Sequence, residues 1–326
     1  NATGEVELPP GGPIDNVPPP TSINSAARPD SGGNAGAVRV EAPQMFVQGT
    51  IESSSVGTGN AGRIDIAGDV IAIGPGGFVV TAASAPGPPE SGDISIQAGE
   101  LQLLGGVVFT SASGEFDGGD TEIVADDILV ERLFGVDASI GTFTSGAGNS
   151  GRVVLRAANA IEIGTGGAIN SSADPASSGG AGDVSVSAAD IDVSGRIYSA
   201  TGGSGPSGTL SVAAESLTLT NGLIYAQTTG AGGSGAVEVA VGSLAALDSS
   251  ILTLTSGTGS AGAIGIEADD VGLEGTTVAS QTVAAGSAGQ VSLDVEGRLA
   301  MTNGSRIAVD SLSEGLSGDV RVSADA

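Results

Sequence analysis

Apolar and polar residues alternate in short runs along most of this chain. In the stretch RIDIAGDVIAI, an apolar pair two positions apart, Ile64 and Ile66, is followed by a second pair, Ile71 and Ile73. After a turn often written with glycine comes a third run, such as Val79-Val80-Thr81. A period of two is typical of β-strands with one buried face. We therefore predict three short strands in each unit of the pattern.

A glycine at the end of a loop marks the start of each unit. These anchor glycines are Gly36, Gly62, Gly92, Gly119, Gly151, Gly182, Gly208, Gly235, Gly262, Gly289 and Gly318. They lie 26 to 32 residues apart, and an alternating apolar pair follows every one except Gly119, where Thr121 takes the first place. A period of this length predicts a repeat architecture.

The units share one strand order and the same turns, which favours strands that pair with the units above and below. We predict an all-β fold: a right-handed, single-stranded parallel β-helix, or β-solenoid, over residues 33–326. It would contain about ten three-strand coils and the first strand of an eleventh. Residues 1–32 do not follow the repeat, hold seven of the 14 prolines, and are predicted to form an extended arm.

Hydroxyl side chains recur at one position of the third strand. Its second inward residue is Ser or Thr in eight of ten units, and this hydroxyl column includes Thr81, Thr110 and Ser199. An outward ladder of hydroxyls could order ice, but these positions are predicted to face inward. We expect them to stabilise the stack through hydrogen bonds from coil to coil.

Four loops match the G-x-G-x-x-G pattern of dinucleotide-binding sites, and GTGNAG at residues 57–62 is the first. That fingerprint requires a helix after the glycines, whose N-terminus meets the phosphates. Here each loop runs into an alternating strand, so we interpret the glycines as coil corners. The chain also has no lysine, which excludes a Walker A loop.

Charge narrows the classes of partner. The chain has 37 acidic residues, ten basic residues and a net charge of −27, which disfavours nucleic acid and anionic membranes. It contains no cysteine for disulfides and no apolar run long enough to cross a membrane. Because the first residue is Asn1 rather than Met, we expect a processed or excised product.

Two units carry a family resemblance: GNAGRIDIAGDVIAIGPGGFVVTAAS (residues 59–84) and GGAGDVSVSAADIDVSGRIYSAT (residues 179–201). They resemble the repeats of filamentous haemagglutinin-like exoproteins of two-partner secretion systems. The resemblance implies a right-handed parallel β-helix, export through an outer-membrane partner, and a place at the bacterial cell surface or outside the cell. The family's Asn-Pro-rich secretion domain is absent from this sequence, so we expect the downstream part of a longer precursor or a branch that uses the repeat differently.

The two ends suggest self-association. A β-helix that ends on a lone strand leaves backbone groups unpaired and an apolar core open. Our hypothesis is that the arm of one subunit completes or covers the C-terminal end of the next and builds a head-to-tail homopolymer. In the alternative, the arm caps its own first coil. The predicted contact residues are Val6, Leu8, Ile14 and Val17 on the arm and Val320 and Val322 on the last strand.

Catalytic and metal chemistry have few candidates. Polysaccharide-active β-helices need convergent carboxylates and often aromatic platforms, but this chain lacks histidine and tryptophan, so we predict no enzyme and no cofactor. Two sets of catalytic candidates are rejected: Asp126, Asp127, Glu131 and Arg132 beside the longest unit, and the pair Asp269 and Asp270. Weak calcium candidates are Asp117, Asp120, Asp126 and Asp127, although the calcium-binding nonapeptide does not recur.

Three functions follow in order of preference. The first is a structural subunit of an exported extracellular fibre whose partner is itself. The second is a surface adhesin that binds host or matrix glycans or proteins through exposed loops, such as the insertion around Glu131 to Phe134. The third is a carbohydrate-active enzyme on the same scaffold.

Overall fold

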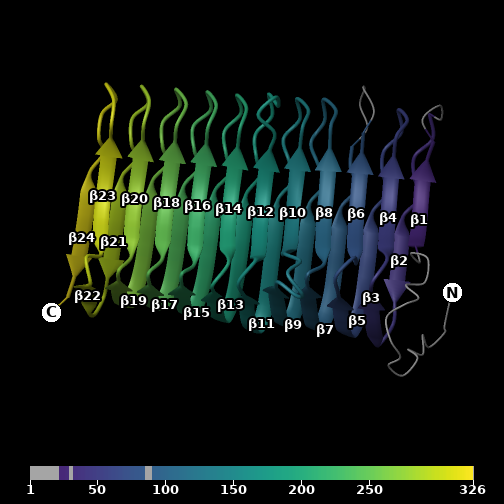
Figure 1. Cartoon of the computed structure of the whole chain (residues 1–326), viewed down its shortest axis with the longest axis horizontal. Coiled ribbons are helices and arrows are strands. Elements are labelled where there is room, and N and C mark those ends of the chain that lie inside the picture. The colour runs from purple at the N-terminus through teal and green to yellow at the C-terminus, as the bar shows by residue number, and fades with distance from the viewer. Residues whose placement is uncertain (1–21, 29–31, 85–89, 326) are drawn as a thin grey trace.

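The chain forms a β-solenoid in which parallel strands stack coil upon coil (Figure 1). The structure is a computed structural model that describes residues 22–28, 32–84 and 90–325, and this part of the chain contains no helix. In Figure 1 the front strands run up the page, the rear strands run down, and the chain advances from right to left. The coils therefore wind in the predicted right-handed sense.

Two parallel sheets face each other across the core. The 11-stranded sheet contains, in spatial order, β1 (Ser22–Ala27), β4 (Thr50–Ser55), β6 (Phe78–Ala83), β8 (Val107–Ala112), β10 (Ala138–Thr144), β12 (Gly167–Ala173), β14 (Arg196–Thr201), β16 (Leu223–Thr228), β18 (Ser250–Thr255), β20 (Thr277–Thr282) and β23 (Arg306–Ser311). The 13-stranded sheet contains β2 (Val38–Glu41), β3 (Gln44–Val47), β5 (Ile64–Ile73), β7 (Ile94–Leu104), β9 (Thr121–Glu131), β11 (Val153–Ile163), β13 (Val184–Val193), β15 (Leu210–Thr220), β17 (Val237–Leu247), β19 (Ile264–Glu274), β21 (Val291–Val295), β22 (Leu299–Thr302) and β24 (Val320–Ala324).

The first and second predicted strands of most coils are one continuous strand. They are separate only at the ends of the stack, as β2 and β3 and as β21 and β22. In the longer strands the pairing register slips where the gap was predicted, as between Ala157 and Ala160 of β11. A column of mostly alanine, including Ala125 and Ala268, fills the inside of this bend. The small side chains let one strand turn without ending, which the spacing of apolar pairs does not reveal.

The solenoid begins earlier than predicted. Strand β1 pairs in parallel with β4, placing Ile23 beside Ile51 and Ser25 beside Ser53. The boundary predicted at residue 33 is therefore too late, because residues 22–27 already occupy the third-strand position of a preceding coil. Ile23 and Ser25 match the I-x-S pattern of the third strand, but the prolines nearby led to the prediction of an arm instead.

The core is a set of aliphatic ladders. Strand pairing aligns identical positions from coil to coil, so that Ile197 lies beside Ile224 and Ile224 beside Ile251. All three are fully buried, as are Ile64, Leu101 and most other predicted inward residues of the inner coils. Burying such a side chain contributes about 1.5–3 kcal/mol, so the repeated ladders supply the main stabilisation.

The anchor glycines form a wall where successive backbones meet. A Cβ atom on Gly62, Gly92 or Gly235 would lie closer than 3.0 Å to the carbonyl of the anchor glycine one coil earlier. In the loop GTGSAG all three glycines, Gly257 included, would clash in this way with the preceding coil. In this loop the three glycines of the G-x-G-x-x-G pattern therefore correspond to three close backbone contacts with the preceding coil.

We predict that Gly235→Ala lowers the free energy of unfolding by about 1–3 kcal/mol or more, because its Cβ would overlap the Gly208 backbone. Gly265→Ala is the matched control: its Cβ would meet nothing closer than the Ser292 Oγ at 3.9 Å. That control is expected to leave stability unchanged or raise it by up to about 1 kcal/mol. Urea denaturation followed by circular dichroism measures both, and equal losses would contradict the backbone contact as the cause.

The hydroxyl column is buried as predicted, but most of its hydrogen bonds go to the anchor glycines rather than to one another. Ser199 donates to the carbonyl of Gly182, the anchor that begins its own unit, at 3.1 Å and accepts from the N–H of the next anchor, Gly208, at 2.7 Å. A threonine in the column, such as Thr253, donates to the next anchor carbonyl, that of Gly262, at 2.6 Å. In the described coils, Thr142 to Ser171 is the one direct bond within the column.

At three anchors that follow a column residue other than serine, Gly119, Gly235 and Gly262, a serine at a second position accepts the hydrogen bond from the anchor N–H. Ala226 interrupts the column, and the Gly235 N–H donates instead to Ser207 at 2.9 Å, the residue before the preceding anchor. Where the column has Thr253, the Gly262 N–H donates to Ser234 at 2.8 Å. Either of two positions in the repeat can therefore satisfy the same backbone donor.

Ser199→Ala is expected to lower the free energy of unfolding by about 1–3 kcal/mol, because the Gly208 N–H and the Gly182 carbonyl lose a buried partner. Adding Ala181→Ser places a serine before the Gly182 anchor, where Ser207 stands in the next coil. We expect the double variant to recover part of the loss in urea denaturation. A double variant no more stable than Ser199→Ala would contradict the interchange of the two positions.

Candidate interaction surfaces

The C-terminal edge exposes residues that are buried everywhere else in the stack. Strand β24 pairs with β21 on one side, and its Val320 and Val322 are 47% and 45% exposed. Their partners one coil earlier, Val291 and Leu293, are fully buried. The two interface residues predicted on the last strand, Val320 and Val322, therefore lie partly exposed at the C-terminal edge of the described stack. The four predicted arm contacts, Val6, Leu8, Ile14 and Val17, lie outside the described residues.

The opposite edge of the described stack is formed by β1. Ile23 is 49% exposed there, whereas Ile51, its partner in β4, is buried. In coil position β1 is a third strand, while β24 is a first strand. The two edges therefore contain different strands of a coil, so β1 and β24 would occupy different positions if they lay in the same coil.

Two of the calcium candidates, Asp117 and Asp120, accept hydrogen bonds from backbone N–H groups at the glycine corner of the next coil. Asp117 accepts the Asn149 N–H at 2.7 Å. Asp120 accepts the Arg152 N–H at 2.7 Å and forms a salt bridge with the Arg152 guanidinium at 2.8 Å. This pairing raises the pKa of Arg152. Both carboxylates satisfy backbone donors at turns where strand pairing stops, a role that their positions in a loop did not reveal.

The other two candidates lie in β9. Asp127 accepts from the Asn159 side chain at 3.2 Å and from the Ala160 N–H at 3.3 Å, at the register slip. Asp126 borders a shallow depression of about 600 Å³ at the strand bend. Nowhere in the described ranges do three or more His, Cys, Asp or Glu side chains gather into a possible metal site.

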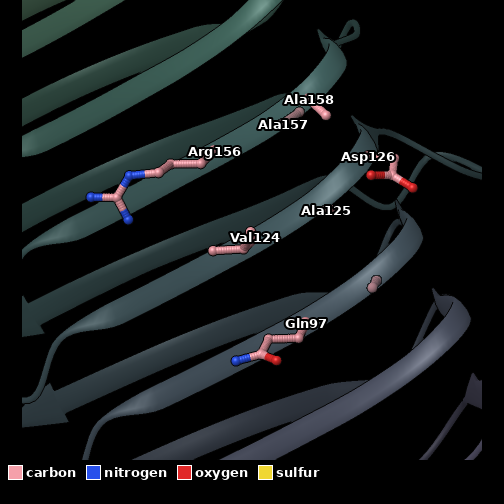
Figure 2. Close-up of a pocket in the computed structure, with 8 residues that line it drawn as sticks. Gln97, Val124, Ala125, Asp126, Arg156, Ala157 and Ala158 are labelled. Atoms are coloured by element: carbon pink, nitrogen blue, oxygen red, sulfur yellow. The ribbon is translucent and has the colours of Figure 1, made fainter.

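Figure 2 shows what that depression offers. Gln97, Val124 and Arg156 occupy paired positions on three successive strands, and Asp126 stands apart at the bend. The Arg156 guanidinium is engaged by the Glu122 carboxylate at 2.6 Å. The lining is completed by alanines, so the described side chains present one free carboxylate and no convergent pair for acid–base chemistry.

The insertion after β9 is a tight two-residue hairpin. Leu133 and Val136 pair in antiparallel fashion, and Phe134 and Gly135 between them have φ values of 52° and 80°. Left-handed angles at both central residues are typical of a type I′ turn. Phe134 at the tip is 89% exposed, an unusual place for an aromatic residue in this backbone region. At its base Arg132 bonds to Asp137 at 2.5 Å, which raises the pKa of Arg132 and lowers that of Asp137.

Charge is distributed unequally between the two sheets. Among the strands of the 11-stranded sheet the charged residues are Glu52, Arg196, Arg306 and Asp310, which cancel. The strands of the 13-stranded sheet carry 18 acidic and three basic residues. The outer surface of the 11-stranded sheet, which we name the neutral face, therefore carries few charged residues and no net charge on its described strands.

The neutral face also carries most of the aromatic side chains. Phe109 and Phe143 pack with ring centroids 6.2 Å apart, and Tyr198 and Tyr225 stack at 5.0 Å with an interplanar angle of 7°. Phe78 at the start of β6 on the same sheet is 41% exposed. The outward residues of single strands look irregular in the sequence, so this surface was missed. The signal that could reveal it is the lack of charge in every third strand between Glu52 and Arg196.

Burial on the neutral face raises the pKa of both tyrosines. Loss of solvation raises the pKa of Tyr198, with Arg196 acting in the opposite direction. Burial, followed by the nearby Tyr198, raises the pKa of Tyr225 to about 12. The pKa of Tyr198 is thus raised above its ordinary value, and the Tyr225 phenol stays neutral until the pH approaches about 12.

Comparison with known proteins identifies no relative. No family model, no curated protein and no solved structure matches this chain. A search of the described residues for a helix long and apolar enough to cross a membrane finds none.

The tyrosines give a pH prediction with a definite sign. Because the folded chain holds the Tyr225 proton more tightly than the unfolded chain does, this contribution to stability is complete below pH about 10 and is lost as the pH rises toward about 12. Ultraviolet titration of tyrosinate should show both phenols ionising above their ordinary pKa, and Tyr225→Phe should remove the higher step. Two ordinary midpoints in the folded protein would contradict this burial.

Proposed function

We propose that this protein is a structural subunit of an extracellular fibre that polymerises head to tail through the edges of its solenoid. The observation that supports this most directly is the fit between the two edges. Strand β1 occupies a third-strand position and β24 a first-strand position at the two edges of the described stack, so both can lie in one shared coil between two subunits. A contact of this kind does not close on itself, and it therefore extends into a filament.

The residues at the two edges support continuous ladders across the junction. If β1 of the next copy pairs with β23 in the same register as the third strands inside the stack, Ile23 lies beside Ile307 and Ser25 beside Val309. On the other sheet, Val320 and Val322 of β24 lie under Val38 and Val40 of the next copy. Each apolar side chain buried in this way contributes about 1.5–3 kcal/mol. The second-strand place remains open, and we assign it to the Pro-rich arm with Val6, Leu8, Ile14 and Val17.

Export and an extracellular location are part of the same proposal. The repeats resemble those of two-partner secretion exoproteins, which act at the cell surface or beyond it. The large negative charge keeps separate rods soluble and discourages binding to anionic surfaces. A fibre outside the cell would use the long run of paired strands as its mechanical element.

An adhesin is the second candidate, and the hairpin tip supports it. Phe134 is exposed on a protruding turn, held there by a backbone conformation that bulky residues rarely adopt. Such a side chain suits an apolar pocket on a host or matrix partner. Phe134→Ala should abolish binding to that partner and leave fibre formation unchanged if both functions are present.

The fibre is tested by charging one edge. Val322→Glu places a carboxylate on the open apolar edge and should reduce filaments in negative-stain electron microscopy to isolated rods. The matched control is Val124→Glu, because Val124 is 42% exposed on the 13-stranded sheet away from both edges. Circular dichroism checks that both variants fold.

Deletion of residues 1–21 tests the arm separately, since it leaves β1 in place. We expect shorter or fewer filaments, because the second-strand place would stay open. Filaments of normal length from both Val322→Glu and the deletion would overturn the head-to-tail proposal, whereas normal filaments from the deletion alone would favour an arm that caps its own first coil.

A further inference from the structure

The neutral face is an extended flat surface with no role in end-to-end assembly. Its outward positions include Phe78, Val80, Phe109, Leu223 and Leu252, which are partly exposed on neighbouring strands. Strands of about six residues at ~3.3 Å and eleven strands at ~4.8 Å span roughly 20 by 50 Å. That area is about 1,000 Å² on one copy, which exceeds the ~800 Å² per partner of an interface of ordinary size.

We propose that the neutral face binds the same face of a second copy of this chain, with the two rods antiparallel. The contact is lateral and does not depend on the proposed head-to-tail fibre. It is isologous: a two-fold axis parallel to the strands passes through β12, the sixth of the 11 strands. Two sheets would then pack face to face at a separation of ~10 Å.

Charge selects this face for self-association. Each copy carries a net charge of −27, and any approach through the 13-stranded sheet brings 18 acidic residues against the same set. Approach through the neutral face leaves those charges on the far sides of both rods. On the neutral face itself, Arg306 already pairs with Asp310 of the same strand at 2.7 Å. The acidic surfaces of the two copies are therefore kept apart, and little net charge opposes the contact.

The antiparallel arrangement also sets apolar outward residues against one another. With the axis through β12, β6 of one copy faces β18 of the other and β8 faces β16, because these strands lie equally far from β12. Phe78 in β6, which is 41% exposed, then lies on a strand opposite Leu252 in β18, and Phe109 in β8 lies on a strand opposite Leu223 in β16.

The aromatic pairs disfavour a sugar polymer as the occupant. Tyr198 and Tyr225 occupy paired positions on adjacent strands, and their nearly parallel rings are 5.0 Å apart. Each ring thus turns a face to the neighbouring coil and an edge outward. A carbohydrate platform presents ring faces to the ligand, whereas ring edges can pack among the side chains of a second sheet.

The experiment uses Val322→Glu as background, so that filament growth does not mask a lateral dimer. Sedimentation velocity should show a monomer–dimer equilibrium that becomes tighter as salt screens the charge on the rods. Adding Leu252→Glu on the neutral face should weaken dimerisation at least tenfold. The matched control Ala240→Glu lies on the outer side of the 13-stranded sheet in the same coil and should leave it unchanged. A background protein that stays monomeric, or equal effects of the two variants, would overturn the lateral pair.

Cross-linking tests the geometry, because the chain has no native cysteine. Ser172→Cys lies on β12 at the proposed axis and should cross-link to itself with a short bismaleimide. Ser111→Cys on β8 should not, since its copies would be about four strand spacings of ~4.8 Å apart. Self-linking of both cysteines would overturn the antiparallel arrangement. Retention on insoluble cellulose that Leu252→Glu abolishes, without any dimer, would overturn self-pairing in favour of a glycan.

The outcomes separate the two proposals. Lateral dimers in the Val322→Glu background, with filaments lost, support both. Dimers together with undiminished filaments would overturn the head-to-tail edge alone, and isolated monomers in that background, with filaments in the unmodified chain, would overturn the lateral pair alone.

Discussion

The structure depends on how closely successive backbones approach at the glycine corners. At the anchor position each coil lies so near to the coil before it that a single Cβ would overlap a carbonyl. This spacing brings the aliphatic positions of both sheets into register, because every coil then starts from the same place. The buried ladders and the inward hydroxyls follow from that shared starting point.

The same corner explains the polar chemistry inside the stack. A turn removes backbone groups from strand pairing, and buried N–H and C=O groups without partners are costly. Serine and threonine satisfy the anchor glycines from inside, as Ser199 does, while Asp117 and Asp120 satisfy the next coil from outside. Acidic residues that look like cation ligands in the sequence are thus hydrogen-bond acceptors of the backbone.

The period and the inward positions were predictable because they depend on local alternation and on glycine spacing, both of which a single sequence displays. The fusion of two strands was not, since the alanine bend satisfies the same apolar pattern as a gap, as in β11. β1 was missed because prolines nearby suggested an arm, although Ile23 and Ser25 obey the repeat. The neutral face was also missed, because it is visible only when outward residues of neighbouring strands are aligned. Pairwise relations between coils, such as Tyr198 with Tyr225, are likewise absent from any one unit.

The interchange of two serine positions links each coil to its neighbour in a directional way. Ser207 lies directly before the Gly208 anchor in the sequence, but its hydroxyl accepts a hydrogen bond from the N–H of Gly235, the anchor one coil later. The repeats are therefore not interchangeable modules. A duplication or deletion by unequal recombination that separated Ser207 from Gly235 would keep this hydrogen bond only if the new neighbouring coil supplied a serine at one of the two positions. The history of such an array is therefore restricted at the junctions that depend on such a serine.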